Sequence, residues 1–358
     1  MSDAAPAPLA PAEAAALERA VALARCGVGA VEPNPPVGAV LLRAGVPLAE
    51  GFHREWGAPH AEAEALAGAG EGARGATLVV TLEPCSSRGG AKKQPPCVDA
   101  VIAAGVRRVV IGALDPDPRH GGAGVARLRA AGVETLVVDA APTRALLARF
   151  AAHLGKQRPF VVLKWAQGVD GSWASADPAA RWISGEAARE QVQRLRARVD
   201  AIVVGSGTVL ADDPALTARP PGPRPLVRVI VDPRARVAAS ARCFVDGAAP
   251  TWWVTGPLRA GEPAAPAGVE RLPLEAPRDV AQALLPLLHA RGVRRLLLEG
   301  GPTLAAAFLG AGVVDRAWVF VAPRAVGGAP PSLPPLPPAS QARLVPWGED
   351  LWYQLEFA

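Results

Sequence analysis

The chain has 358 residues, of which 50% are hydrophobic and 4 are cysteines, and its formal net charge is +5. This length exceeds what one hydrophobic core usually fills and predicts two domains, while a modest charge spread along the chain argues against nucleic acid as a partner. Because the N-terminal segment lacks a basic stretch followed by an apolar core, and no stretch approaches the roughly 18 apolar residues of a membrane span, we expect a cytoplasmic protein without signal peptide or membrane anchor.

The first half of the chain alternates helical and strand-like patterns. The expected elements are, in order, helix 12–27, strand 37–42, helix 60–69, strand 76–82, helix 97–105, strand 107–114, helix 124–132, strand 133–139 and helix 141–154. Strands that alternate with helices of this length predict parallel pairing and an α/β sandwich. A polar segment, GKQRP, follows the last helix, so we place the first domain at residues 1–155 and the second at 156–358.

The alternating pattern restarts after this junction. The expected elements are strand 159–166, helix 185–199, strands 201–209, 225–232 and 250–256, helix 279–292 despite Pro286, strand 294–301, helix 302–312 and a last strand at 317–323. The proline-rich segment 329–338 is expected to be irregular. The two halves contain different motifs, so the sequence shows no internal repeat.

Four residues of the first half point to a metal site. His60 and Glu62 open one predicted helix, Cys85 follows a predicted strand, and Cys97 begins another helix after two prolines. A reducing cytoplasm disfavours a disulfide between the two cysteines, which leaves metal binding or catalysis. One imidazole and two thiolates make three ligands for tetrahedral zinc, with one position open for water. Glu62 can then serve as a carboxylate that moves protons without ligating the metal.

Two other interpretations of these cysteines stay open. The site could be a closed structural zinc knot whose fourth ligand is Cys26, His53 or Asp99, or the two cysteines could be unrelated buried residues. Cys26 and Cys243 are interpreted as small buried side chains. A His-x-Glu followed by Pro-Cys is the signature of the zinc deaminases, whose second half is usually Cys-x-x-Cys. Here the spacer between Cys85 and Cys97 has eleven residues instead of two.

The stretches around these residues carry a family resemblance. PNPPVG (33–38), GFH (51–53), PHAE (59–62), TLEPC (81–85), PPC (95–97) and DPDP (115–118) occur in that order. The chain resembles the bifunctional riboflavin-biosynthesis family, in which a pyrimidine deaminase is fused to a reductase. This resemblance implies hydrolytic deamination of a phosphorylated pyrimidine, 2,5-diamino-6-(5-phosphoribosylamino)pyrimidin-4-one. It also implies a cytidine-deaminase-like α/β/α sandwich with Zn²⁺ held by His60, Cys85 and Cys97, and with Glu62 as the proton shuttle.

The resemblance assigns three substrate contacts to this first domain. Asn34 and His53 match family positions. The simpler interpretation of Asn34 is turn chemistry before a proline, and that of His53 is a surface position at a strand end. The loop between the cysteines departs from the family, because Ser87 stands where a histidine is usual. Lys93 matches the family's basic residue by its distance from Cys97, and we expect it to contact the phosphate or the base.

In the second half, Glu299-Gly300-Gly301-Pro302-Thr303 lies between a predicted strand and a predicted helix. Backbone N–H groups and a positive helix end at such a turn favour a pyrophosphate. No GxGxxG follows the first strand of this half, which argues against an ordinary Rossmann site.

The motifs of this half resemble the reductase domain of the same family, whose fold is like dihydrofolate reductase. The resemblance implies that NADPH reduces the opened ribose, giving 5-amino-6-(5-phosphoribitylamino)uracil. The implied substrate contacts are Lys164, Trp182, Ser184, Arg196, Asp212, Leu216, Arg219 and Glu299. The implied cofactor contacts are Asp170, Thr208, Asp212, Gly300, Gly301 and Thr303. Arg196 and Arg219 would hold the phosphate, for which the guanidinium fork is well suited.

The reductase half also departs from the family at the expected phosphate end of its pocket. Gly168 replaces a serine, and residues 176–181 replace a Ser-Gly-Glu-Ser run. Two alternatives to a bifunctional enzyme therefore remain: a reductase whose deaminase half has drifted, and a non-enzymatic, zinc-stabilised binding protein. The presence of all four residues His60, Glu62, Cys85 and Cys97 favours the bifunctional enzyme, which we expect to be a homo-oligomer.

Overall fold

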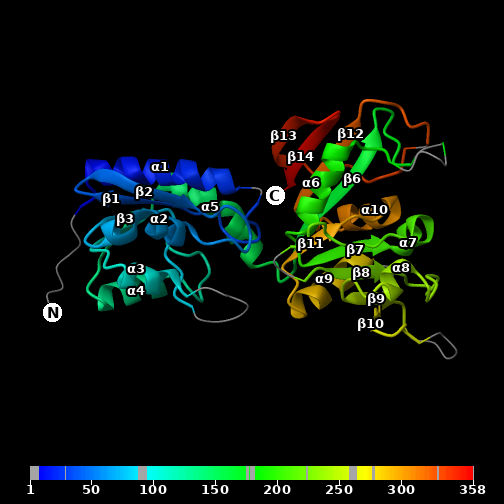
Figure 1. Ribbon diagram of the computed structural model, residues 1–358, viewed down its shortest axis with the longest axis horizontal. Helices are drawn as coiled ribbons and strands as arrows, with labels where there is room; N and C mark the ends of the chain where they lie inside the picture. The colour runs from blue at the N-terminus through cyan, green and yellow to red at the C-terminus, as the bar shows by residue number, and fades with distance from the viewer. Residues whose placement is uncertain are drawn as a thin grey trace. The chain divides into compact units, whose positions relative to one another are not determined.

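The computed structural model describes residues 8–28, 30–87, 95–174, 177, 182–222, 225–257, 264–275, 279–328 and 330–357. The chain divides into two compact units, Met1–Lys156 and Gln157–Ala358, one residue from the junction expected from the sequence (Figure 1). Each unit contains one β-sheet with helices on both faces, so the expected α/β class is confirmed for both. Among the described residues, no helix is long and apolar enough to cross a membrane.

The first unit contains a five-stranded sheet in the order β2-β1-β3-β4-β5. Its strands are β1 (Gly38–Arg43), β2 (Val46–Phe52), β3 (Thr77–Val80), β4 (Arg108–Ile111) and β5 (Glu134–Val137). The last three run parallel as expected, but β1 pairs antiparallel with both β2 and β3, so the expectation of parallel pairing throughout was wrong. The sequence pattern missed β2, most of whose side chains are exposed. Ala44 and Gly45 take positive φ angles, as a tight hairpin turn requires.

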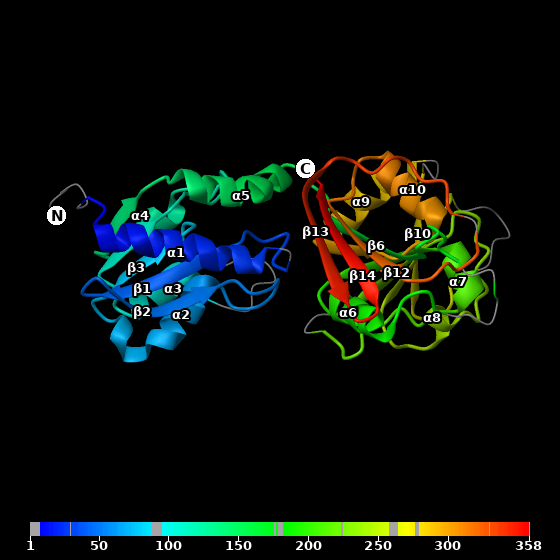
Figure 2. The same ribbon diagram turned by 90° about the horizontal axis from the view of Figure 1, so that it is seen from above.

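The helices of the first unit are α1 (Pro11–Gly27), α2 (Ala61–Ala69), α3 (Cys97–Ala103), α4 (Ala123–Ala130) and α5 (Ala141–Leu154), with a short 3-10 helix at Gly70–Ala73. Helix α1 packs on one face of the sheet through a cluster that includes Leu17 and Val79. Helices α2, α3 and α4 cover the opposite face (Figures 1 and 2). A Cβ on Gly51 would lie 2.4 Å from the Ala61 carbonyl oxygen, so this glycine lets the start of α2 approach strand β2.

The second unit contains a nine-stranded sheet in the order β10-β9-β8-β7-β11-β6-β12-β14-β13. Its strands are β6 (Phe160–Gly168), β7 (Ala201–Gly205), β8 (Val227–Val231), β9 (Thr251–Thr255), β10 (Val269–Pro273), β11 (Arg295–Leu298), β12 (Arg316–Ala322), β13 (Ala339–Trp347) and β14 (Asp350–Phe357). Pairing is parallel from β10 to β12 and antiparallel from β12 through β14 to β13. The expectation that the strand at 317–323 is the last was therefore wrong, and β10 was also missed.

The helices of the second unit are α6 (Glu186–Arg196), α7 (Ser206–Asp212), α8 (Arg242–Val245), α9 (Val280–Ala290) and α10 (Pro302–Gly310). Helices α9 and α10 pack on one face of the sheet, and α6, α7 and α8 pack on the other. The strand expected at 201–209 ends at Gly205, where α7 begins. The helix buries Val209 against the sheet, so tertiary packing overrides the β-like pattern of GSGTV.

Candidate active sites

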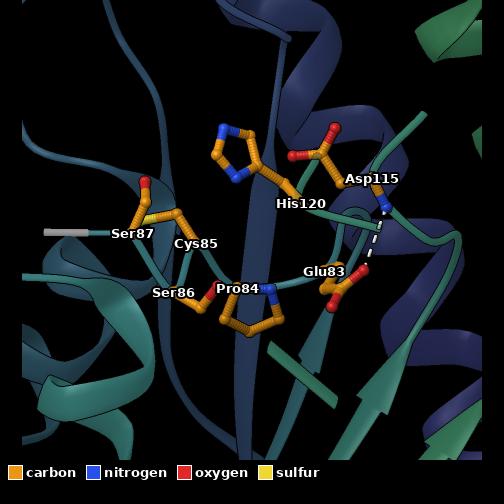
Figure 3. A pocket seen from close by; sticks show the side chains of 7 residues that line it. All are labelled: Glu83, Pro84, Cys85, Ser86, Ser87, Asp115 and His120. Atoms are coloured by element: carbon orange, nitrogen blue, oxygen red, sulfur yellow. Dashed lines mark hydrogen bonds between the residues drawn. The ribbon is translucent and has the colours of Figure 1, made fainter. Parts of the chain in front are cut away.

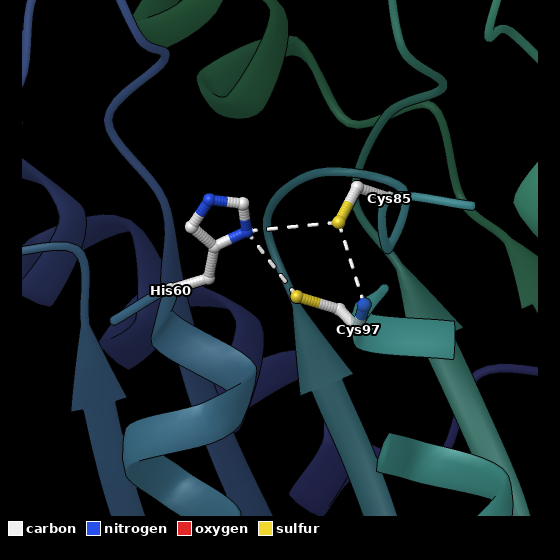
Figure 4. Close-up of side chains that lie close together, drawn as sticks. All are labelled: His60, Cys85 and Cys97. Atoms are coloured by element: carbon white, nitrogen blue, oxygen red, sulfur yellow. Dashed lines mark hydrogen bonds between the residues drawn. The ribbon is translucent and has the colours of Figure 1, made fainter. Parts of the chain in front are cut away.

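The side chains of His60, Cys85 and Cys97 meet in the first unit, at the starts of helices α2 and α3 (Figure 4). His60 is the residue before helix α2, Cys97 is the first residue of α3, and Cys85 lies in the segment after β3. The His60 Nδ1 atom is 3.2 Å from Cys97 Sγ and 3.7 Å from Cys85 Sγ. The Cys97 backbone N–H donates to Cys85 Sγ at 3.4 Å, so the start of α3 points a donor at this sulfur.

The three ligand atoms fit a tetrahedral zinc ion. They lie within 4.8 Å of one another, and bonds of about 2.0–2.3 Å to a common tetrahedral centre place ligand atoms roughly 3.6 Å apart. One imidazole nitrogen and two sulfurs are a donor set that zinc prefers. The Cys97 thiol and the His60 imidazole hydrogen-bond to Cys85 and lower the pKa of its thiol to about 3. A thiolate is the form of cysteine that ligates metal.

The described residues place no fourth histidine, cysteine or carboxylate in this metal-ligating group. Each of the three considered from the sequence is engaged elsewhere. Cys26 is exposed and its thiol contacts the Ala22 carbonyl oxygen, which also corrects the expectation that Cys26 is buried. Asp99 pairs with Arg127, and His53 directs both ring nitrogens to other partners. This arrangement favours an open zinc position over a closed structural knot.

Glu62 lies in the first turn of α2, two residues after His60, and is only 3% exposed. Burial raises the pKa of its carboxyl group. The Cys97 side chain is a hydrogen-bond partner of this carboxyl, so Glu62 reaches the ligand cluster although it is not one of its three members. A buried carboxyl group at this place can take up and release protons beside an open metal position.

Asn34 and His53 lie side by side next to the metal ligands. The Asn34 Nδ2 and His53 Nε2 atoms are 3.3 Å apart, and His53 Nδ1 is 2.9 Å from the Pro59 carbonyl oxygen. The rings of His53 and His60 meet edge to face with centroids 5.3 Å apart. His53 is buried, which lowers the pKa of its imidazole, so its simpler interpretation as a surface histidine was wrong.

A small cavity of about 40 Å³ lies beside Cys85 (Figure 3). It is lined by Glu83, Pro84, Cys85, Ser86, Ser87, Asp115 and His120. The buried Glu83 carboxylate accepts hydrogen bonds from the backbone N–H groups of Asp115, Gly122, Gly124 and Val125, at 2.7–3.1 Å. Glu83 therefore fixes the loop that follows β4, which carries Asp115 and His120 to the cavity.

The sequence assigned no role to Asp115 or His120, although Asp115 opens the DPDP motif. Its position directly after a buried strand was the signal that could have found it, because the ends of neighbouring parallel strands meet at one edge of a sheet. Lys93, the third substrate contact expected in this unit, lies outside the described residues.

In the second unit the structure brings together three of the expected substrate contacts. Lys164 lies on β6, Glu299 follows the neighbouring strand β11, and Arg196 is the last residue of α6. Arg196 donates through Nε and Nη2 to the two carboxylate oxygens of Glu299, at 2.8 and 2.7 Å. Burial lowers the pKa of Lys164, while Glu299 opposes this shift. Lys164 and Arg196 are thus two cations that act on one partly buried carboxylate, and the Arg196 fork is already paired within the protein.

The glycine turn after β11 lies beside α7. A Cβ on Gly301 would be 3.8 Å from Thr208 Oγ1, which brings two expected cofactor contacts together. Gly301 precedes helix α10, which begins with Pro302, and Thr303 is exposed in its first turn. Gly300 is buried, and a Cβ there would be 2.9 Å from the Leu304 side chain. A strand that enters a helix through two glycines offers the close backbone approach that a dinucleotide phosphate needs.

Three expected contacts, Asp212, Leu216 and Arg219, lie in the segment LADDPALTAR (210–219), at and after the end of α7. Asp212 is the last residue of α7 and is exposed, whereas Leu216 is buried and has a φ of 50°. Asp213 follows with a left-handed φ of 39°, and its carboxylate accepts a hydrogen bond from the Arg242 backbone N–H at 2.7 Å. Asp213 thus satisfies a backbone donor at the start of α8. Arg219 is exposed, and its backbone N–H donates to Gln193.

The remaining expected contacts lie near the ends of β6 and β12. Trp182 is 55% exposed and the Arg189 guanidinium lies over its ring at 5.2 Å. Ser184 is buried, and its carbonyl oxygen accepts a hydrogen bond from Arg189. Asp170, expected to contact the cofactor, directs its carboxylate to the backbone N–H groups of Ser172, Val326 and Gly327.

Comparison with known families matches each unit to a different model. Residues 12–113 match the cytidine and deoxycytidylate deaminase zinc-binding region, and residues 159–349 match the RibD C-terminal domain. The first match contains the cluster of His60, Cys85 and Cys97, and the second contains Lys164, Arg196 and Glu299.

The chain is similar over most of its length to proteins described as riboflavin biosynthesis protein RibD. It is 40% identical to that of Aquifex aeolicus, covering 87% of each chain, and 37% identical to that of Escherichia coli, covering 90% of each. A solved structure from Thermotoga maritima, described as a diaminohydroxyphosphoribosylaminopyrimidine deaminase/5-amino-6-(5-phosphoribosylamino)uracil reductase, matches with a TM-score of 0.72 and 33% identity over 97% of this chain and 99% of that one. With both halves matched in one continuous alignment, the chain belongs to the RibD family of riboflavin biosynthesis proteins.

Proposed function

We propose that this chain catalyses two successive reactions of riboflavin biosynthesis. The first unit removes an amino group hydrolytically from 2,5-diamino-6-(5-phosphoribosylamino)pyrimidin-4-one. The second reduces the ribosyl group of the product with NADPH, giving 5-amino-6-(5-phosphoribitylamino)uracil. The observation that carries this proposal is the cluster of His60, Cys85 and Cys97 beside the buried Glu62, in the same chain as a reductase domain. The Thermotoga maritima relative is described as both a deaminase and a reductase.

In the deaminase half, this chain's residues hold the metal, orient the ring and move protons. Zinc, when bound, supplies the charge that makes a water molecule nucleophilic near neutral pH. The Glu62 carboxylate takes one proton from that water and gives it to a nitrogen of the pyrimidine ring. It then takes the proton of the hydroxyl group added to the ring and gives it to the amino group, which leaves as ammonia. Asn34 and His53, fixed by their mutual contact and by the Pro59 carbonyl group, present donors and acceptors to the ring. Lys93 contacts the phosphate or the base.

In the reductase half, NADPH supplies the hydride when it is bound. Gly300, Gly301 and Thr303 hold its phosphate groups at the start of α10, beside Thr208. Lys164 and Glu299 face the opened ribose, and Arg196 fixes the Glu299 carboxylate by its two hydrogen bonds. Of the two arginines expected to hold the substrate phosphate, Arg196 is paired with Glu299 and Arg219 is exposed, so we assign the phosphate to Arg219. We also propose, from the sequence, that the enzyme is a cytoplasmic homo-oligomer.

Ammonia release tests the deaminase half alone. The purified chain incubated with the diaminopyrimidine phosphate should release ammonia when NADPH is absent, because the first reaction needs no reductant. Ammonia release that requires NADPH would contradict the proposed order of the reactions.

The two acids of the LADDP segment are expected to separate by assay. Asp212→Asn should lower NADPH oxidation by roughly tenfold, the scale of a lost hydrogen bond to a charged group, because an exposed carboxylate at the end of α7 can accept from ribose hydroxyls. Asp213→Asn should leave the reductase rate unchanged and lower the free energy of unfolding by about 0.5 kcal/mol, since asparagine keeps an acceptor for the Arg242 N–H and tolerates a left-handed φ. Steady-state rates and melting temperatures of both variants check this, and a fully active Asp212→Asn enzyme would remove Asp212 from the site.

A further inference from the structure

The loop after β12 lies against the loop after β6 in the second unit. The two strands pair in parallel, with Ala322 opposite Gly168, so both loops leave the sheet at the same edge. The Val169 backbone N–H donates to the Arg324 carbonyl oxygen at 3.1 Å. The Ser172 hydroxyl donates to the Gly328 carbonyl oxygen. Contacts at both ends therefore join residues 324–328 to residues 169–172.

Between these two contacts, the Asp170 side chain joins the same two loops. One carboxylate oxygen, Oδ2, accepts hydrogen bonds from the backbone N–H groups of Val326 and Gly327 at 3.0 and 2.8 Å. The other, Oδ1, accepts from the Ser172 N–H at 3.3 Å. These backbone donors, the Gly327 N–H above all, lower the pKa of Asp170. Asp170 thus holds the backbone of the 324–328 loop against the loop after β6.

Arg324, at the start of that loop, reaches a third segment. Its Nη2 atom donates to the carbonyl oxygens of Trp182 and Ile183 at 2.9 and 3.2 Å. Other residues hold the neighbouring groups of the same segment, because Arg189 donates to the Ser184 carbonyl oxygen and the Gly185 N–H donates to Asp350. The backbone of residues 182–185 is therefore fixed from several sides, and its side chains include the expected substrate contacts Trp182 and Ser184.

The absence of a side chain at position 168 makes this arrangement possible. A Cβ on Gly168 would lie 2.5 Å from Asp170 Oδ1 and 2.7 Å from the Arg324 carbonyl oxygen. Real Cβ atoms essentially never make contacts this short, so any larger residue would force the Asp170 side chain and the Arg324 backbone away from residue 168. Gly168 stands where the family resemblance leads us to expect serine.

We propose that Asp170 and Arg324 are positioning residues of the reductase half: through the 324–328 loop they fix the backbone of residues 182–184 and so set the orientation of Trp182 and Ser184 toward the phosphorylated substrate. This inference rests on the proposed reductase activity. Asp170 then acts on catalysis without touching the cofactor, which differs from the cofactor contact expected from the sequence. Because Gly168 has no side chain, the Asp170 carboxylate and the Arg324 backbone can approach it closely.

Arg324→Ala tests this directly, with the deaminase half of the same chain as an internal control. We expect the KM for the deaminated phosphoribosylaminouracil to rise about tenfold, because the hydrogen bonds from a charged donor to two carbonyl groups are lost. The kcat of reduction, the KM for NADPH and the rate of ammonia release should stay within about twofold. Arg324→Lys keeps one charged donor and should recover most of the loss. Arg343→Ala, which removes an exposed arginine from strand β13, is the matched control and should change nothing.

Gly168→Ala provides an independent variant that alters no side chain of the pair. It should raise the same KM, and combining it with Arg324→Ala should add little, because both changes release the same segment. An unchanged substrate KM in Arg324→Ala, or equal losses in Arg324→Ala and Arg343→Ala, would overturn the inference. A native chain that does not oxidise NADPH with this substrate would instead overturn the proposed function.

Discussion

Glu62→Gln should lower the rate of deamination by at least about a hundredfold, the usual scale of a positioned proton transfer, while leaving the zinc content unchanged. Glutamine has nearly the shape of glutamate and fits the same buried place in the first turn of α2, but it cannot take a proton from water. The residue lies outside the group of three ligand atoms, so the metal should remain. Ammonia release and metal analysis of the same preparation measure both parts of the prediction.

Two comparisons make this result specific. Glu71→Gln changes an exposed glutamate in the same unit and should deaminate at the native rate. NADPH-dependent reduction of the already deaminated substrate should also be unaffected in Glu62→Gln, because that chemistry belongs to the second unit. Near-native ammonia release by Glu62→Gln would end the assignment of Glu62 as the proton shuttle.

Cys97→Ala should reduce bound zinc from about one ion per chain to a small fraction of that, and deamination should fall further than in Glu62→Gln. The variant removes one of three ligand atoms, and it also removes the thiol that hydrogen-bonds to Cys85 and stabilises its thiolate. Two remaining protein ligands are too few for the tetrahedral site that zinc requires. Metal analysis after extensive dialysis, with ammonia release on the same samples, provides the measurement.

Cys26→Ala is the matched control, because Cys26 is an exposed cysteine of the same unit whose thiol contacts the Ala22 carbonyl oxygen and does not belong to the ligand group. It should keep its zinc and its deaminase rate. A Cys97→Ala chain that retains a full complement of zinc would remove Cys97 from the metal site and would reopen the interpretation of the two cysteines as unrelated residues.

The metal cluster was predictable from the sequence because each ligand lies at the end of a strongly patterned element. His60 and Cys97 each follow a proline at the start of a helix, and Cys85 comes after a buried strand. Such ends meet at one edge of the sheet whatever the details of the loops between them. The spacer of eleven residues therefore did not obscure the site.

Two of the strands missed by the sequence pattern have little buried apolar surface. Strand β2 exposes most of its side chains, and strand β13 is exposed along most of its length. Strand β14 alternates buried and exposed residues through Asp350, Leu351, Trp352 and Tyr353, a pattern of period two that predicts a strand. That signal could have extended the predicted sheet beyond residue 323.

The contacts of Arg196 and Asp170 could not be read from the sequence, because they depend on which charged groups the fold brings together. Arg196 was expected to bind a phosphate, yet its guanidinium fork meets Glu299, a residue 103 positions away. Asp170 was expected to face the cofactor, yet its carboxylate meets backbone groups 156 and 157 positions away. A motif identifies which residues matter, whereas long-range packing decides whether each one contacts a ligand or another part of the protein.

The most direct test of the account is to incubate the purified chain with 2,5-diamino-6-(5-phosphoribosylamino)pyrimidin-4-one, with and without NADPH, and to identify the products by mass spectrometry. Without NADPH, the product should have exchanged one amino group for oxygen and should keep its ribosyl group. With NADPH, the product should be 5-amino-6-(5-phosphoribitylamino)uracil, which carries two additional hydrogens. Reduction of the starting compound without deamination would show that the first unit is not a deaminase, and an unchanged substrate under both conditions would contradict the proposed bifunctional enzyme.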